Sequence, residues 1–180
     1  MKALLFLTGL LIGLSSWGNE HVRIMFHGNV FASDSEALIS GNRPTSFRMA
    51  DAHITITSEG QIIHEQFSSS NGAFATILEP GKHYIIHVRQ DGYLTRSVSV
   101  DTSMIPEANE LKVYKIYGDI TLMSTPAHLT DEYFTGFNMA KAEYAAQNQR
   151  LEWDRDHARR VFEVILPTLK GEDGLAKQEP

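Results

Sequence analysis

Apolar and polar positions alternate along most of the first two-thirds of this chain. Val22, Ile24 and Phe26 alternate with Arg23 and Met25, and a period of two is typical of a β-strand with one buried face. The same pattern predicts further strands over residues 52–57, 61–67, 73–78, 84–89, 97–100 and 111–123. Short strands at near-regular spacing favour an antiparallel β-sandwich of about seven strands, which we expect to span residues 19–123.

Turns are predicted between these strands, because glycine follows a polar residue or a proline at four places. They are Glu59-Gly60, Asn71-Gly72, Pro80-Gly81 and Asp91-Gly92, and such pairs are common in tight turns. The polar segment 32–49 breaks the alternation. We expect it to form a long loop, which in a compact domain is usually either functional or mobile.

The pattern changes after Ser124. Residues 140–144 are compatible with a last strand or a helical turn, and residues 147–149 with a turn. Residues 124–170 are therefore expected to form a C-terminal extension, and the charged residues 171–180 a disordered tail.

A helix is predicted within this extension. Asp154 is a suitable N-cap, and the apolar residues that follow recur at helical spacing, at Ala158, Val161, Phe162 and Ile165. This stripe predicts a helix packed on the sandwich. Pro167 is expected to end the helix or to kink it.

The N-terminus has the pattern of a secretory signal peptide. Lys2 precedes an apolar run over residues 3–14, and small residues flank Trp17 before Asn19. The run is too short to span a bilayer comfortably. We expect residues 1–18 to be removed and the mature chain to be periplasmic or associated with the outer membrane, or else secreted.

Composition narrows the classes of partner. The 180 residues carry a formal charge of −6, which disfavours nucleic acids and anionic membrane surfaces as partners. The chain contains no Cys, so disulfides, a lipid-bearing Cys and a Cys-ligated zinc site are excluded. No second apolar segment reaches transmembrane length.

Several short motifs carry a family resemblance. They are Gly28-Asn29-Val30, the strand 52–56, Gly72-Ala73-Phe74, Pro80-Gly81, the strand 84–88 and Gly92-Tyr93. In this order and spacing they resemble the carboxypeptidase regulatory-like domain, a transthyretin-like β-sandwich related in architecture to immunoglobulin-like domains. Segments 101–106, 140–144 and 151–154 are similar to exported proteins of Bacteroidota-type bacteria, in which a short helix follows such a sandwich. The resemblance implies a non-catalytic accessory that braces or connects envelope components.

The candidate chemistry is sparse. His83 and His87 lie on one side of one predicted strand, but four strand residues span about 13 Å, too far for direct ligands of one metal. We interpret them as solvated surface histidines and expect no metal and no cofactor. The run 72–84 also resembles a strand pair of intradiol ring-cleaving dioxygenases, but the His-x-His element that follows in those enzymes is absent. A Gly-x-Ser-x-Gly elbow and a phosphate-binding loop are absent too. The sequence therefore predicts no catalytic residues and no enzyme.

Four residues are candidates for contact with a partner protein: Ile85, His83, His87 and Trp153. If Tyr84 and its alternate neighbours fill the core, Ile85 points outward. The C-terminal helix, neighbouring side chains or a partner could cover it. Trp153 is either a recognition anchor or, as we prefer, a residue that attaches the helix to the sandwich.

The leading hypothesis is an exported, non-catalytic envelope module that binds one or more envelope proteins. A first alternative is a domain that binds a small ligand or a carbohydrate, with Phe47, Tyr133, Phe134 and Phe137 as its contact surface. A second alternative is a metal-dependent enzyme that uses the histidines.

Overall fold

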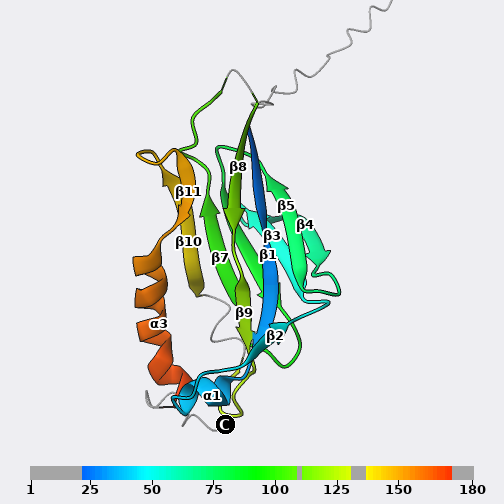
Figure 1. Cartoon of the computed structure of the whole chain (residues 1–180), viewed down its shortest axis with the longest axis vertical. Coiled ribbons are helices and arrows are strands. Elements are labelled where there is room, and N and C mark those ends of the chain that lie inside the picture. Colours follow the sequence, from blue (N-terminus) through cyan, green and yellow to red (C-terminus); the bar gives the residue numbers. More distant parts are fainter. Residues whose placement is uncertain (1–21, 109–110, 131–136, 172–180) are drawn as a thin grey trace, which may run out of the picture.

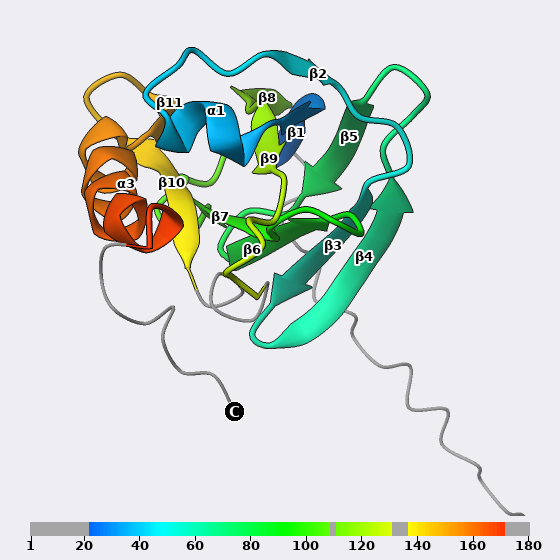
Figure 2. The same ribbon diagram turned by 90° about the horizontal axis from the view of Figure 1, so that it is seen from below.

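A computed structural model describes residues 22–108, 111–130 and 137–171. The predicted signal peptide and the predicted C-terminal tail beyond Gly171 lie outside these ranges. Two β-sheets face each other across one core, and a helix lies along one side of them (Figures 1 and 2). The predicted β-sandwich with a C-terminal helix is confirmed.

The first sheet is built around one long strand, β1 (Val22–Ser33). It pairs antiparallel with β5 and β2 and parallel with β8 and β9. These strands are β2 (Ser46–Arg48), β5 (Ala73–Leu78), β8 (Lys112–Tyr117) and β9 (Ile120–Met123). Every other residue of β1 from Val22 to Phe26 is buried, as the alternation predicts.

The second sheet has six strands in the order β11-β10-β7-β6-β3-β4. They are β3 (His53–Ser58), β4 (Gln61–Phe67), β6 (His83–Arg89), β7 (Arg96–Asp101), β10 (Asn138–Ala145) and β11 (Arg150–Trp153). The β7–β10 pair is parallel. Strands β10 and β11 come from the predicted extension, so that segment contributes to the sandwich itself.

The described residues contain eleven strands, against about seven expected for this architecture. Part of the difference lies in segment 32–49, which was expected to be a loop. It forms the short helix α1 (Ser35–Ile39) and strand β2. Ser35 is buried, and its hydroxyl and N–H bond the Ser124 hydroxyl. Short polar elements of this kind have no alternation to reveal them.

The core lies between the two sheets. Phe26 packs edge-on against Phe74, with ring centroids 5.2 Å apart. The largest fully buried side chains around them include Ile24, Ile54, Ile56, Leu78, Tyr84, Ile86 and Leu122. Tyr84 keeps its hydroxyl satisfied at the margin of the core, where it accepts a hydrogen bond from the Glu79 N–H. Burial of these alternating apolar side chains stabilises the packing of one sheet against the other.

Helix α3 (Arg155–Leu169) begins at Asp154, whose carboxylate accepts the His157 N–H, so the predicted N-cap is correct. Ile165 and Leu169 are fully buried in a second apolar cluster with Leu94 and Met123. Pro167 does not end the helix, which continues to Leu169.

The helix does not cover Ile85. It lies along β10 (Figure 1), and β7 separates β10 from β6. Phe162, which was expected to dock on the sheet, is 38% exposed. No helix of the described residues is long and apolar enough to cross a bilayer.

Two glycines allow β1 to change its parallel neighbour from β8 to β9. The Gly118 N–H bonds the His27 carbonyl. A Cβ added to Gly28 would overlap the Gly118 carbonyl oxygen, and one added to Gly118 would lie 2.7 Å from the Trp153 ring. This close approach leaves no room for a side chain at either position.

Replacement of Gly28 by Ala should therefore destabilise the fold by about 3 kcal/mol, because backbone rather than a flexible side chain must move. Gly60→Ala is the matched control, since its φ is 77° but nothing lies near the new methyl. It should cost about 1–2 kcal/mol. Urea unfolding of both variants measures this difference, and equal losses would show that the Gly28–Gly118 contact is unimportant.

One buried cation stands out in the described part of the chain. Arg96 is 7% exposed, and its Nε and Nη1 atoms have no hydrogen-bond partner. Burial lowers the pKa of its guanidinium to about 10, so the side chain remains charged at neutral pH.

Arg96→Met should raise the free energy of unfolding by about 1–3 kcal/mol, because it removes unsatisfied buried donors and keeps an unbranched side chain. Arg23→Met, on an exposed position of β1, should change it by less than about 0.5 kcal/mol. A loss of stability in Arg96→Met, measured by urea unfolding, would mean that the guanidinium is satisfied in solution.

Candidate functional site

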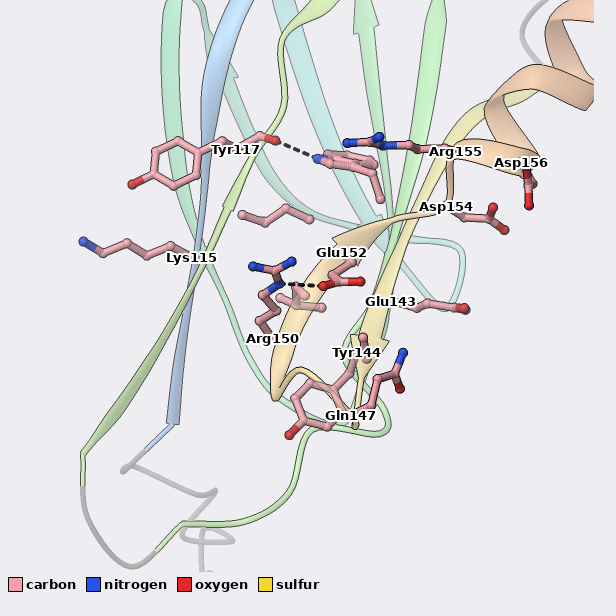
Figure 3. Close-up of a pocket in the computed structure, with 14 residues that line it drawn as sticks. Lys115, Tyr117, Glu143, Tyr144, Gln147, Arg150, Glu152, Asp154, Arg155 and Asp156 are labelled. Atoms are coloured by element: carbon pink, nitrogen blue, oxygen red, sulfur yellow. Dashed lines mark hydrogen bonds and ion pairs between the residues drawn. The ribbon is translucent and has the colours of Figure 1, made fainter.

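A groove runs between β8 of the first sheet and the β10–β11 hairpin of the second sheet (Figure 3). Its volume is about 990 Å³, and it is lined from β8, both strands of the hairpin and the start of α3. Among the described residues β8 pairs only with β1, and β11 pairs only with β10. Two strand edges without a strand partner therefore border the groove, and they come close to each other where Trp153 of β11 bonds the Tyr117 carbonyl of β8.

Trp153 joins the two sides of the groove. Its indole Nε1 donates to the Tyr117 carbonyl oxygen at 2.6 Å, and its ring packs edge-on against Phe26 with centroids 6.2 Å apart. Gly118 supplies the space for the ring. Trp153 thus attaches the hairpin that leads into α3 to the first sheet, as the preferred interpretation of the sequence predicted.

Each of the four carboxylates that line the groove forms an ion pair with a lysine or arginine close to it in the sequence. Glu143 pairs with Lys141, Glu152 with Arg150, Asp154 with Arg160 and Asp156 with Arg159. Hydrogen bonds from Arg150 and then Asn148 lower the pKa of the Glu152 carboxyl. In Figure 3, Glu143, Asp154 and Asp156 extend to the side of the hairpin that faces away from β8.

The uncommitted charges of the groove are positive. Lys115 and Arg155 line it and take part in none of the ion pairs formed by the described residues. The Lys115 side chain extends from β8 to the side away from the hairpin (Figure 3), so Arg155, whose charge also acts on Glu152, is the unpaired cation nearest the hairpin side of the groove. Aromatic rings complete the walls. Tyr144 packs edge-on against Tyr114, with ring centroids 5.8 Å apart. The Tyr117 ring is 63% exposed on the side of β8 away from the hairpin (Figure 3), where it is tilted against the His27 ring with centroids 3.9 Å apart. The groove can thus accept acidic and apolar groups.

Of the four candidate partner-binding residues, three lie elsewhere. His83, Ile85 and His87 lie on the outer face of β6, whereas Trp153 packs toward the core from β11. Ile85 is half-buried between its cross-strand neighbours Thr57 and Ser99. The structure does not bring the four together, and their contact with a partner stays a prediction.

The two histidines are not simply solvated. His87 Nδ1 lies 2.7 Å from the Ser97 hydroxyl, and burial lowers the pKa of its imidazole. His83 lies opposite Asp101 on β7. Partial burial opposes ionisation of Asp101, but bonds from Ser103 and the charges of His83 and Lys141 lower its pKa. Cross-strand neighbours such as these cannot be read from spacing along one strand.

The aromatic set suggested for sugar binding is dispersed. Phe47 is 59% exposed on β2, and Phe137 packs against the second apolar cluster. Tyr133 and Phe134 lie outside the described residues. Within the described ranges, no three His, Asp or Glu side chains converge as metal ligands.

Comparison with known proteins assigns no family to the chain. No family model and no curated protein matches the chain. Among solved structures, 3-chlorocatechol 1,2-dioxygenase from Rhodococcus opacus is similar with a TM-score of 0.36, 11% identity, and 57% of this chain and 60% of that chain covered. A minor pilin of Streptococcus agalactiae is similar with a TM-score of 0.37 and 12% identity, and the match covers 58% of this chain and 46% of the pilin. The 5-hydroxyisourate hydrolase of Klebsiella pneumoniae is similar with a TM-score of 0.32 and 12% identity, and the match covers 56% of this chain and 90% of the hydrolase.

The matches to the dioxygenases and the pilin cover only about half to three-fifths of the length of those proteins. They correct one expectation. The sequence predicted that the chain is not an enzyme, but several of the similar solved structures are catechol dioxygenases. The fold therefore gives no ground for excluding catalysis, and at these identities it assigns none.

Trp153→Phe should lower the free energy of unfolding by about 1–2 kcal/mol, because it removes the indole hydrogen bond and leaves a smaller ring. Tyr117→Phe is the control, since it keeps the backbone acceptor of that bond and the ring. It should change stability by less than about 0.5 kcal/mol. Urea unfolding followed by far-UV circular dichroism compares them. An unchanged Trp153→Phe variant would show that the indole does not hold the hairpin.

Proposed function

We propose that this chain is a protein-binding module of the bacterial envelope that receives an extended, acidic segment of a partner protein in the groove between β8 and β11. The observation that carries the proposal is the pair of strand edges that border the groove without a strand partner, on which, among the described residues, only the Tyr117 carbonyl is already bonded, by Trp153. An unpaired edge is a template for an added strand, and β-strand addition is a recurring way to bind extended peptides.

The charge of the groove favours an acidic segment. Its four carboxylates are already paired, whereas Arg155 at the start of α3 is not. A carboxylate of the partner would gain a counter-ion without displacing an existing pair. Such charges improve the rate and specificity of association more than the final affinity, so the backbone pairing would supply most of the binding energy.

The envelope setting rests on the sequence. The pattern of residues 1–18 favours export, and the motif order of residues 28–100 resembles the carboxypeptidase regulatory-like family, whose exported members brace or connect envelope components. A rigid sandwich also suits this task, because its edges and loops are held in fixed positions.

Site-specific photo-crosslinking in the exported protein tests the proposal. A benzoylphenylalanine at Tyr144, which lines the groove, should give one crosslinked partner in the periplasmic or outer-membrane fraction. The same probe at Ile62, which is exposed on the distant edge strand β4, should not. Arg155→Glu should weaken the adduct about tenfold or more, because one favourable charge becomes a repulsive one.

Equal crosslinking from the groove and from Ile62 would contradict the groove as the site, and so would an adduct unaffected by Arg155→Glu. Retention of an uncleaved chain in the cytoplasm would contradict the envelope setting. Mass spectrometry of the recovered chain, expected to begin near Asn19, distinguishes this failure from the other two.

A further inference from the structure

A second hollow lies at the end of the six-stranded sheet where β3 begins and β4 and β6 end. Its volume is about 620 Å³, within the range of about 300–1,000 Å³ that is common for small-molecule sites. One cross-strand row forms its wall: Phe67 on β4, His53 on β3 and Arg89 on β6. The turn after β6, with Asp91 and Tyr93, and the Asp51 loop complete the lining.

The row is held in one arrangement by its own contacts. The Arg89 Nε–H donates to His53 Nδ1 at 2.8 Å, so the ring proton is on Nε2, which lies 3.4 Å from the Glu65 carboxylate. The His53 side chain is only 18% exposed. Its ring lies against Phe67 with centroids 5.0 Å apart and 31° between their planes.

The opposite wall is also fixed. Asp51 has a φ of 57°, a left-handed conformation that only a well-determined surrounding maintains in a residue other than glycine. Ser68, which is 2% exposed, provides that surrounding. Its hydroxyl donates to the Met49 carbonyl and accepts the Ala52 N–H, and its carbonyl accepts the Asp51 N–H.

The groups left unused in this hollow point to the ligand class. Phe67 is 64% exposed, so His53 covers only part of its surface. Asp51 and Asp91 take part in no ion pair of the described residues, and no terminal nitrogen of Arg89 makes a hydrogen bond there. The hollow thus offers an apolar ring, two carboxylate acceptors and a guanidinium donor.

We propose that this hollow binds the end of a neutral saccharide. A pyranose has an apolar C–H face that packs on an aromatic ring and a rim of hydroxyls that need both donors and acceptors, and Phe67, Arg89 and the two aspartates supply these. Two carboxylates against one guanidinium disfavour an anionic ligand by simple charge balance. This site is separate from the groove beside β11, since β3 and β4 form the opposite end of the sheet.

The test is a titration of the purified ¹⁵N-labelled protein with glucose, galactose, mannose, xylose and N-acetylglucosamine, and with glucuronate as the anionic probe. At least one neutral sugar should shift the backbone amides of residues 51–53, 67 and 89–93. Phe67→Ala and Arg89→Gln should each weaken that sugar about tenfold or more, which corresponds to about 1.4 kcal/mol of binding free energy.

Phe47→Ala is the matched control, because Phe47 is 59% exposed but lies on β2 of the other sheet. It should leave the affinity unchanged. Circular dichroism shows whether each variant is folded. If Phe67→Ala or Arg89→Gln unfolds, Asp91→Asn replaces it as the variant that removes one proposed sugar contact. The proposal is overturned if no neutral sugar shifts these amides, if glucuronate binds more tightly, or if Phe47→Ala weakens binding as much as Phe67→Ala.

Discussion

The whole sandwich depends on the pairing of β1. This strand hydrogen-bonds with four others, and it is antiparallel to two of them and parallel to the other two. It can do so because its alternating side chains all enter one core while its backbone at Gly28 comes close enough to Gly118 for the chain to pass from β8 to β9. The groove, in turn, exists because β8 is held at this position and Trp153 reaches it from the second sheet.

The two lateral sides of the sandwich differ in what covers the edges of the sheets. On one side the β10–β11 hairpin and α3 extend the six-stranded sheet and cover part of its margin (Figures 1 and 2). On the other side β4 and β5 are edge strands with exposed apolar residues such as Ile63 and Ile77. The two proposed sites follow this difference, since one uses the gap that the hairpin leaves and the other the ends of β3, β4 and β6.

Much of the fold was readable from alternation and turns. The strands around Ile24, Ile54 and Tyr84 and the cap at Asp154 were predicted correctly, because burial of one face imposes a period on the sequence and capping uses few residue types. Strand direction was not readable, since alternation is the same in parallel and antiparallel pairs. Strand β11 was missed as well: its Leu151 is buried, but four residues are too few to show a period.

The two proposed sites could not be predicted from the sequence, because alternation within one strand does not show which strands are neighbours. The groove and the row of Phe67, His53 and Arg89 each join residues from separate strands, so neither has a motif. The histidine pair on β6 was noticed because it lies within one segment, although its neighbours Ser97 and Asp101 are on another. A hairpin of residues 140–153 could have been inferred from the turn at 147–149, and it would have pointed to the groove.

The central position of β1 also has a consequence for how the chain reaches its native state. Strand β1, the first strand of the described residues, pairs with residues 112–123 along one side, so that side stays unpaired until most of the polypeptide has been synthesised. Distant pairings of this kind slow folding and prolong the exposure of apolar surface.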